Sequence, residues 1–219
     1  TDDSDVTIVG IGTGTITTTI TTTAGLQLGG DIDGEAANDQ SGKSVSLSSD
    51  GTIVAIGAYM NDGTAGSDSG HVRVYQYSNS AWTQLGADID GEASGDYSGW
   101  AVSLSSDGSI VAIGAYSNDG NGSAAGHVRV YQYSNSAWTQ LGSDIDAEAA
   151  DNFSGYSVSL SSDGSIVAIG APKNADSGSN AGHVRVYQYS NSAWTQLGAD
   201  IDGEASGDFS GVSVSLSSD

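Results

Sequence analysis

Short apolar runs alternate along the chain with clusters of Gly, Asn, Asp and Ser, and no segment keeps a 3.6-residue period. In one clear instance, Ala101–Ser105 ("AVSLS") alternates apolar and small polar residues, which is typical of a half-buried β-strand. Ile110–Ala115 ("IVAIGA") is apolar throughout, which indicates a strand covered on both faces. Two further alternating runs follow at His127–Tyr133 and Ala137–Leu141. The pattern predicts an all-β protein.

The segments between these runs predict how the strands are connected. Asp107-Gly108 lies between the first two strands and predicts a tight hairpin, because Gly accepts a positive φ. The letters "SNS" at 134–136 predict a second short turn. Longer loops follow the second and fourth strands, so an up-and-down sheet would carry both long loops at one end and both tight turns at the other.

The same four-strand pattern recurs along the chain. The phrase Leu-Gly-x-Asp-Ile-Asp begins at Leu28, Leu85, Leu141 and Leu197, and residues 85–140 match residues 141–196 at 42 of 56 positions. Four antiparallel strands per repeat of this length are typical of a β-propeller blade, and a sheet that is apolar on both faces must stack on a neighbour. A β-solenoid is the rival fold, but tight hairpins fit it poorly.

The two ends of the chain resemble parts of one further repeat. Residues 5–13, 14–23 and 25–34 match the second, third and fourth strands, while residues 213–219 ("SVSLSSD") match the first strand. These matches predict a single four-bladed propeller domain in which both termini share the closing blade. Its parts are a split blade of 1–28 plus 213–219, the units 29–84, 85–140 and 141–196, and the start of a next unit at 197–219. The alternative is a fragment of a longer propeller or repeat array.

Composition narrows the classes of partner. The 219 residues include 27 acidic and 5 basic side chains, giving a net charge of −22, which disfavours binding to nucleic acid and to anionic membranes. The chain has no Cys, which excludes disulfides and thiol chemistry. No apolar run approaches the roughly 18 residues of a membrane helix.

The third repeat resembles a known family. Residues 153–172 ("FSGYSVSLSSDGSIVAIGAP") and 182–189 ("GHVRVYQY") are similar to the FG-GAP repeats of integrin α-subunit propellers. The name-giving positions are occupied by Phe153, Gly155, Gly170, Ala171 and Pro172. The resemblance implies a β-propeller with an extracellular adhesive or scaffolding role. Members of the family often carry a calcium loop between the first two strands, but the hairpin "SSDG" at 161–164 is too short to cage an ion.

The acidic loop after each fourth strand is the candidate metal site. In "DIDGEASGDYSG", at residues 88–99, carboxylates occupy positions 1, 3, 5 and 9, and such alternation around a Gly turn can supply several of the oxygen ligands that Ca²⁺ requires. Calcium is therefore the candidate ion, and a solvated acidic loop is the alternative, since Gly99 stands where a closing Glu would lie. The candidate ligands are Asp31, Asp33, Glu35, Asp39, Asp88, Asp90, Glu92, Asp96, Asp144, Asp146, Glu148, Asp200, Asp202, Glu204 and Asp208.

Three other residue types recur once per repeat. Trp82, Trp138 and Trp194, in "AWTQ", are candidates for stacking on sugar rings, with packing between blades as the alternative. The arginines of "GHVRVY" are expected to pair with nearby carboxylates. Its histidines are expected to contact loops rather than to share one zinc ion, because equivalent positions on separate blades lie far apart.

These observations favour a non-catalytic, secreted or cell-surface β-propeller with a structural or adhesive role and a protein or glycan partner. Near-identical repeats argue against an enzyme, since a catalytic site needs one place unlike the others. A carbohydrate-binding module that uses the repeated tryptophans is the first alternative. An enzyme that acts in the central channel is the second.

Overall fold

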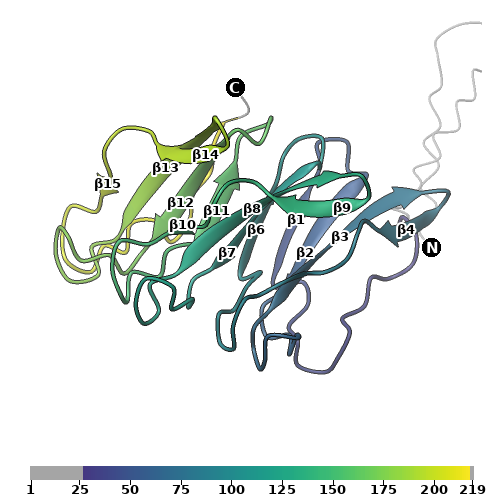
Figure 1. Ribbon diagram of the computed structural model, residues 1–219, viewed down its shortest axis with the longest axis horizontal. Coiled ribbons are helices and arrows are strands. Elements are labelled where there is room, and N and C mark those ends of the chain that lie inside the picture. The colour runs from purple at the N-terminus through teal and green to yellow at the C-terminus, as the bar shows by residue number, and fades with distance from the viewer. Residues whose placement is uncertain (1–26, 218–219) are drawn as a thin grey trace, which may run out of the picture.

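The computed structural model describes residues 27–217, in which all regular structure is β (Figure 1). The strands form three antiparallel sheets that follow one another along the chain. The first contains β1 (Ser44–Leu47), β2 (Ile53–Ala58), β3 (His71–Ser78), β4 (Ala81–Gln84) and β5 (Ile89–Asp90). The second contains β6 (Ala101–Leu104), β7 (Ile110–Ala115), β8 (His127–Ser134), β9 (Ala137–Gln140) and β10 (Ile145–Asp146). The third contains β11 (Ser157–Leu160), β12 (Ile166–Ala171), β13 (His183–Ser190), β14 (Ala193–Gln196) and β15 (Ile201–Asp202).

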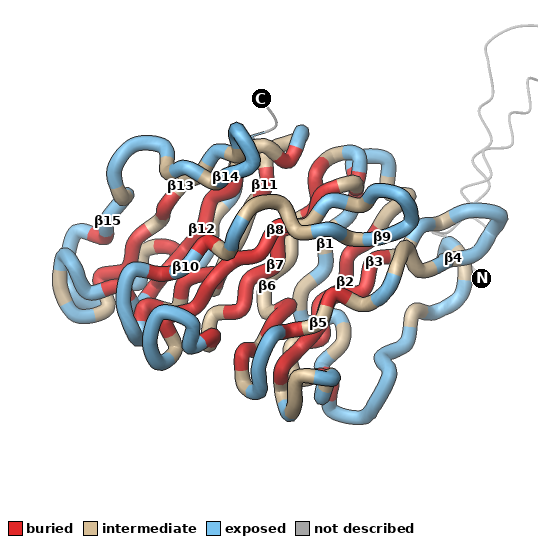
Figure 2. The backbone as a smooth tube through the Cα atoms, in the orientation of Figure 1, coloured by how far each residue is buried: buried red, intermediate tan, exposed pale blue. Residues whose placement is uncertain are grey.

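Each sheet is an up-and-down blade of four strand positions, with two short strands sharing the outer position, and the predicted β-propeller fold is confirmed. Within residues 27–217, no helix is long and apolar enough to cross a membrane. The predicted strand positions hold to within a residue, and every position of β7 is buried, as its unbroken apolar run predicts (Figure 2). Asn135 and Ser136 have φ values of 51° and 64°, so the turn between β8 and β9 has positive φ at both central positions.

The outer strand of each blade is divided, which the sequence pattern did not predict. In the first blade β4 and β5 both pair with β3, at its C-terminal and N-terminal halves respectively. The Leu85 N–H continues the pairing by donating to Val74 O at 2.8 Å, and Gly86 then turns the chain outward with a φ of +72°. The bulge over 86–88 interrupts a strand that otherwise continues through Ile89.

Two apolar cores lie between consecutive blades and stabilise the stack. The first joins Ala55, Val72, Val74 and Ile89 to Leu104, Val111 and Ile113, and the second joins Ile110, Ala112, Val128, Val130 and Ile145 to Leu160, Val167 and Ile169. Leu104 and Leu160 are each 7 % exposed, whereas the equivalent Leu47 on the first blade is 57 % exposed. Each of these leucines is therefore buried only where a preceding blade packs against it.

Glycines bring the backbones of neighbouring blades into contact. Gly114, in β7, faces the carbonyl oxygen of Gly155, which opens the next blade, and a Cβ on Gly114 would overlap that oxygen. Gly57 and Gly170 meet Gly99 and Gly211 in the same way. A side chain at any of these three positions would force the blades apart. The junction therefore requires glycine at the first position of each "GA" in the repeat.

Further hydrogen bonds join the first strands of neighbouring blades. The Leu104 N–H donates to Ser46 Oγ at 2.9 Å, and the Leu160 N–H donates to Ser103 Oγ at 3.0 Å. The hairpin turns add backbone bonds from Ser49 N to Ser106 O and from Ser106 N to Ser162 O, both 2.8 Å. The junctions thus join backbone to backbone as well as apolar face to apolar face.

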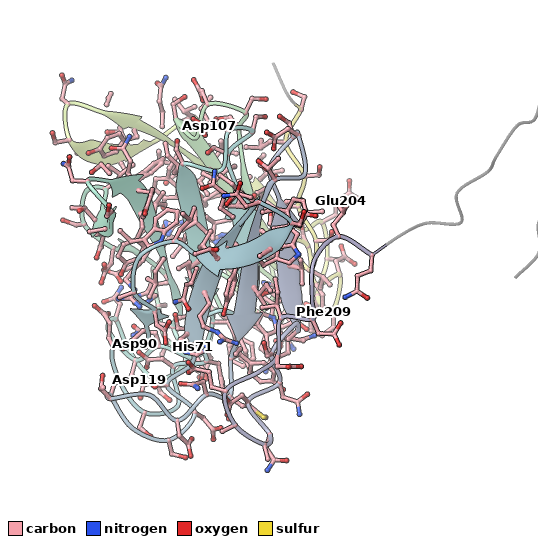
Figure 3. All side chains as sticks on the ribbon, turned by 90° about the vertical axis from the view of Figure 1, so that its right-hand side faces the viewer. His71, Asp90, Asp107, Asp119, Glu204 and Phe209 are labelled. Carbon is pink, nitrogen blue, oxygen red and sulfur yellow. The ribbon has the colours of Figure 1, made fainter. Side chains whose placement is uncertain are left out.

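The long loops gather at one end of the blades, as predicted. Gly70, before β3, bridges in parallel to Ser98, after β5, so these two loops lie side by side. Figure 3 places the hairpin residue Asp107 at the opposite end from His71, Asp90 and Asp119. Candidate chemistry is therefore concentrated at the long-loop end.

The predicted closing blade falls largely outside the described residues. Within 213–217, the Leu216 N–H donates to Ser159 Oγ at 3.0 Å, the bond that the first strands of the second and third blades also make to their predecessors. The segment therefore takes the place of a first strand. The four-blade ring and its boundaries stay a prediction.

We expect Gly114→Ala to destabilise the fold by about 3 kcal/mol, because the added methyl overlaps backbone that cannot rotate away. Gly30→Ala is the matched control, since a Cβ there meets nothing within 4 Å. Urea unfolding of both variants measures the difference. Equal midpoints for the two variants would show that the glycine contact does not fix the junction.

Candidate functional site

The carboxylates of one acidic loop are distributed over two blades. Asp88 stays with its own blade, where its Oδ1 accepts a hydrogen bond from Gln84 Nε2 at 2.6 Å. Glu92, four residues later, reaches the next blade, and its Oε1 lies 3.4 Å from Nη1 of Arg129. Each blade junction therefore receives acidic side chains from two consecutive loops.

The last acid of the loop has a structural role. Asp96 is buried, and its Oδ2 accepts hydrogen bonds from Ala93 N at 3.0 Å and from Asn118 Nδ2 at 2.9 Å. Asp39 makes the same bond to Asn61 at 3.0 Å. These carboxylates tie the loop to the blade that follows.

A buried histidine at the start of each third strand faces carboxylates. His71 Nδ1 lies 3.7 Å from Asp88 Oδ2 and 3.8 Å from Glu35 Oε2, and His127 Nδ1 lies 3.6 Å from Asp144 Oδ2 and 3.9 Å from Glu92 Oε2. Burial lowers the pKa of His127 to about 4, with help from the charge of Arg129 and against the pull of Asp144. The imidazole is thus neutral at pH 7 despite its acidic neighbours.

The described residues contain three such groups, each with one histidine. They are Glu35, His71 and Asp88; Glu92, His127 and Asp144; and Glu148, Asp176, His183 and Asp200, and within each group the donor atoms lie within 4.8 Å of one another. Each group combines imidazole nitrogen with carboxylate oxygen, a donor set that suits a transition-metal ion better than calcium.

The arginines confirm the predicted pairing with carboxylates. The Nη1 to Oε1 distances are 3.7 Å from Arg73 to Glu35, 3.4 Å from Arg129 to Glu92 and 3.3 Å from Arg185 to Glu148. Their Nη2 atoms donate to the backbone carbonyls of Asp33, Asp90 and Asp146. Each guanidinium thus holds the end of the preceding loop by side chain and backbone together.

The remaining candidate ligands lie beside these groups or at the ends of the described chain. Asp146 and Asp202 place Oδ1 4.0 Å from Nδ1 of His127 and His183 respectively. Asp31 accepts from Gln27, Asp208 accepts from Ala205 N, and Glu204 is exposed. The structure does not bring the four acidic positions of one loop to a single point, and calcium binding at these loops stays a prediction.

The repeated tryptophans pack against the preceding blade. Trp138 Nε1 donates to Leu85 O at 2.8 Å, and its ring centroid lies 5.1 Å from that of Tyr133. Trp82 and Trp194 donate in the same way to Leu28 O and Leu141 O. The indole N–H is therefore bonded within the stack.

A row of aromatic side chains crosses the long-loop end, and the sequence pattern did not predict it. Neighbouring ring centroids lie 4.7 to 5.7 Å apart along Tyr59, Tyr97, Trp100, Tyr116, Phe153 and Tyr156. Lys43 and Lys173 place Nζ 4.4 and 3.8 Å from the rings of Trp100 and Phe153. Aromatic residues recur after "GA" and around "SG" in successive repeats, and this recurrence could have predicted the row.

The short hairpin at 161–164 uses its carboxylate within the turn. Asp163 Oδ1 accepts hydrogen bonds from Ser165 N at 2.9 Å and from the hydroxyls of Ser161 and Ser165, both at 2.8 Å. These bonds, led by the Ser165 N–H, hold the pKa of Asp163 below its ordinary value of 3.8. Asp50 and Asp107 make the equivalent bonds.

The family comparison agrees with this architecture. A model described as "FG-GAP repeat" matches residues 32–75, 87–131 and 143–187, which is more than half of the chain. The chain belongs to the FG-GAP repeat family. The Phe153-Gly155 and Gly170-Ala171-Pro172 motifs therefore mark junction positions, since Gly155 and Gly170 each contact a neighbouring blade.

The similarity of this chain to individual known proteins is distant. No curated protein matches this FG-GAP chain in sequence. Among solved structures it is similar to Kuenenia stuttgartiensis hydrazine synthase (11 % identity, 83 % of this chain and 42 % of that chain, TM-score 0.47). It is also similar to Saccharomyces cerevisiae Sqt1 (14 % identity, 75 % and 36 % of the chains, TM-score 0.48). The FG-GAP chain thus spans less than half the length of either.

We expect Trp138→Ala to destabilise the protein by about 3 kcal/mol through lost packing, and Trp138→Phe by about 1 kcal/mol through loss of the bond to Leu85 O. Denaturant unfolding followed by circular dichroism measures both. If Trp138→Ala unfolds at the wild-type midpoint, the side chain is not part of the junction.

The hairpin carboxylates predict loss of stability in acid. A carboxyl whose folded pKa is depressed stabilises the fold above its unfolded pKa, here 3.8, and that contribution disappears as the pH falls through the lower folded value. The thermal midpoint of the wild type should decrease when the pH is lowered below about 4. In a variant in which Asp50, Asp107 and Asp163 are all replaced by Asn, the midpoint should decrease less over the same pH range. Asp151→Asn is the control for charge alone. If the thermal midpoints of the wild type and the triple variant depend on pH in the same way, the hairpin carboxylates are not the cause of the acid sensitivity.

Proposed function

We propose that this FG-GAP propeller domain is a non-catalytic structural or adhesion module of an extracellular or cell-surface protein. The observation that carries the proposal is the repetition of the same junction, with its acidic loops, from blade to blade. Repetition presents one surface chemistry several times over, which suits multivalent attachment. A catalytic centre requires instead a single constellation that differs from its surroundings.

The charge distribution supports this proposal. A net charge of −22 keeps the domain soluble, and the acidic loops lie at one end of the blades with the basic side chains paired or stacked within it. Such an end favours a basic partner protein and repels anionic surfaces. FG-GAP repeats are typical of extracellular proteins.

A bead assay tests the adhesive role. Beads coated densely with the folded domain should be retained on a cell layer at least tenfold more than beads coated with the heat-unfolded chain, because many weak contacts act together. Raising the salt concentration should reduce this retention, since the proposed contacts are electrostatic. Equal retention of both bead types contradicts adhesion, and turnover of ester, glycoside or peptide substrates by the folded domain contradicts the non-catalytic assignment.

The aromatic row supports carbohydrate binding as a second candidate function. Six neighbouring rings at the long-loop end are half-buried, and aromatic rings of this kind can stack on sugars, whereas the Trp138 indole is engaged with the preceding blade. Sugar stacking would thus occur at Trp100 rather than at the repeated tryptophans.

A glycan array separates these two surfaces. Binding that is lost in Trp100→Ala and retained in Trp138→Phe would support a lectin-like role of the aromatic row. Absence of binding by the wild-type domain would contradict it and leave the adhesion proposal unaffected.

A further inference from the structure

The junction before the third blade differs from the other two in having a fourth donor. Glu148, His183 and Asp200 correspond to the three residues of the earlier groups, and Asp176 joins them within the same 4.8 Å limit. The equivalent positions in the first and second blades are Gly63 and Gly120. Among the described residues, only this group has one imidazole nitrogen and three carboxylate oxygens that all lie within 4.8 Å of one another. Asp146 also lies 4.0 Å from His127 Nδ1, but it does not join Glu92, His127 and Asp144 in such a group.

The histidine of this group is aimed at the carboxylates without a hydrogen bond. His183 is 2 % exposed, and its buried Nδ1 has no hydrogen-bond partner. The carboxylate oxygen Asp200 Oδ2 is 3.6 Å away, too far for a hydrogen bond. Two ligand atoms of a tetrahedral zinc ion lie about 3.3 Å apart, as bond lengths of about 2.0–2.1 Å require. The spacing thus suits two atoms that share an ion.

The surrounding residues hold the donors in place. Asn174 Nδ2 donates to Asp176 Oδ2 at 3.1 Å, and the Asp176 N–H donates to Asn174 Oδ1 at 3.0 Å. Gln196 Nε2 donates to Asp200 Oδ1, which leaves Oδ2 toward the histidine. Bonds of this kind orient metal ligands in proteins.

The charge of the group favours a cation. Three carboxylates face a single guanidinium, that of Arg185, whose Nη1 lies 3.3 Å from Glu148 Oε1, and Asp202 adds a further carboxylate oxygen 4.0 Å from His183 Nδ1.

We propose that this FG-GAP domain binds a divalent transition-metal ion of the Zn²⁺ class through His183 Nδ1 and the carboxylates of Glu148, Asp176 and Asp200. The imidazole nitrogen selects against calcium, which takes oxygen ligands. Glu148 comes from the segment that links the second blade to the third, while the other three ligands belong to the third blade. The ion therefore fastens the linker to the blade and stabilises their junction. The three-donor groups of the other junctions bind the same ion more weakly.

Zinc titration of the chelator-treated protein tests the site. Isothermal titration calorimetry should detect one tight site in the wild type, and Asp176→Gly, which restores the residue of the other blades, should weaken it at least tenfold. Asp151→Asn is the control, because Asp151 is an exposed acid of the preceding loop outside the group. The thermal midpoint should rise more with Zn²⁺ than with Ca²⁺ at equal concentration.

A transplant tests the site by gain rather than by loss of zinc binding. The Gly120 N–H donates to Asn118 Oδ1 at 2.8 Å, the same local bond that Asp176 makes to Asn174. Gly120→Asp should therefore create a second tight zinc site beside Glu92, His127 and Asp144. Equal zinc affinity in the wild type, Asp176→Gly and Gly120→Asp would overturn the proposal, as would a calcium response as large as the zinc response.

Discussion

The close approach of neighbouring backbones at paired glycines determines the geometry of this protein. Gly57, Gly114 and Gly170 each lie against a carbonyl oxygen of the next blade with no room for a methyl group. Apolar attraction between blades is non-directional and would tolerate a range of spacings. The glycine contact and the N–H bonds to Ser46 and Ser103 select one spacing. The name-giving glycines of the family are thus constraints on blade packing.

The chemistry at the long-loop end depends on that spacing. Glu92 reaches Arg129 and His127 only because the loop that carries it crosses from one blade to the next at a fixed distance. The same crossing brings Glu148 beside His183 and Asp200. Each group includes carboxylates from two consecutive acidic loops, so a change in blade spacing alters the distances between them. The side-chain groups therefore belong to the junctions rather than to individual loops.

The local pattern in the sequence was enough to predict the blades. Alternation in Ala101–Ser105, the apolar run of Ile110–Ala115 and the Asp107-Gly108 hairpin each depend on neighbours within one sheet, and their strands appear as predicted. The divided outer strand was missed because its bulge begins at Gly86, in a segment that also looks like an ordinary loop. The pairing of arginines with carboxylates was predicted, but the grouping of the carboxylates was not. The spacing of the carboxylates suggested one metal site within each acidic loop, whereas the side chains of one loop contact partners on two blades.

Hydrogen exchange at the Leu104 and Leu160 amides is the most direct test of the claim that the blades form one cooperative stack through their junctions. These N–H groups bond only across a junction, to Ser46 Oγ and Ser103 Oγ, whereas the Val130 amide lies inside a sheet. The account predicts that all three exchange at similar rates, because opening a junction requires global unfolding. Exchange at Leu104 and Leu160 that is orders of magnitude faster than at Val130 would show that the blades separate independently, and would contradict the account.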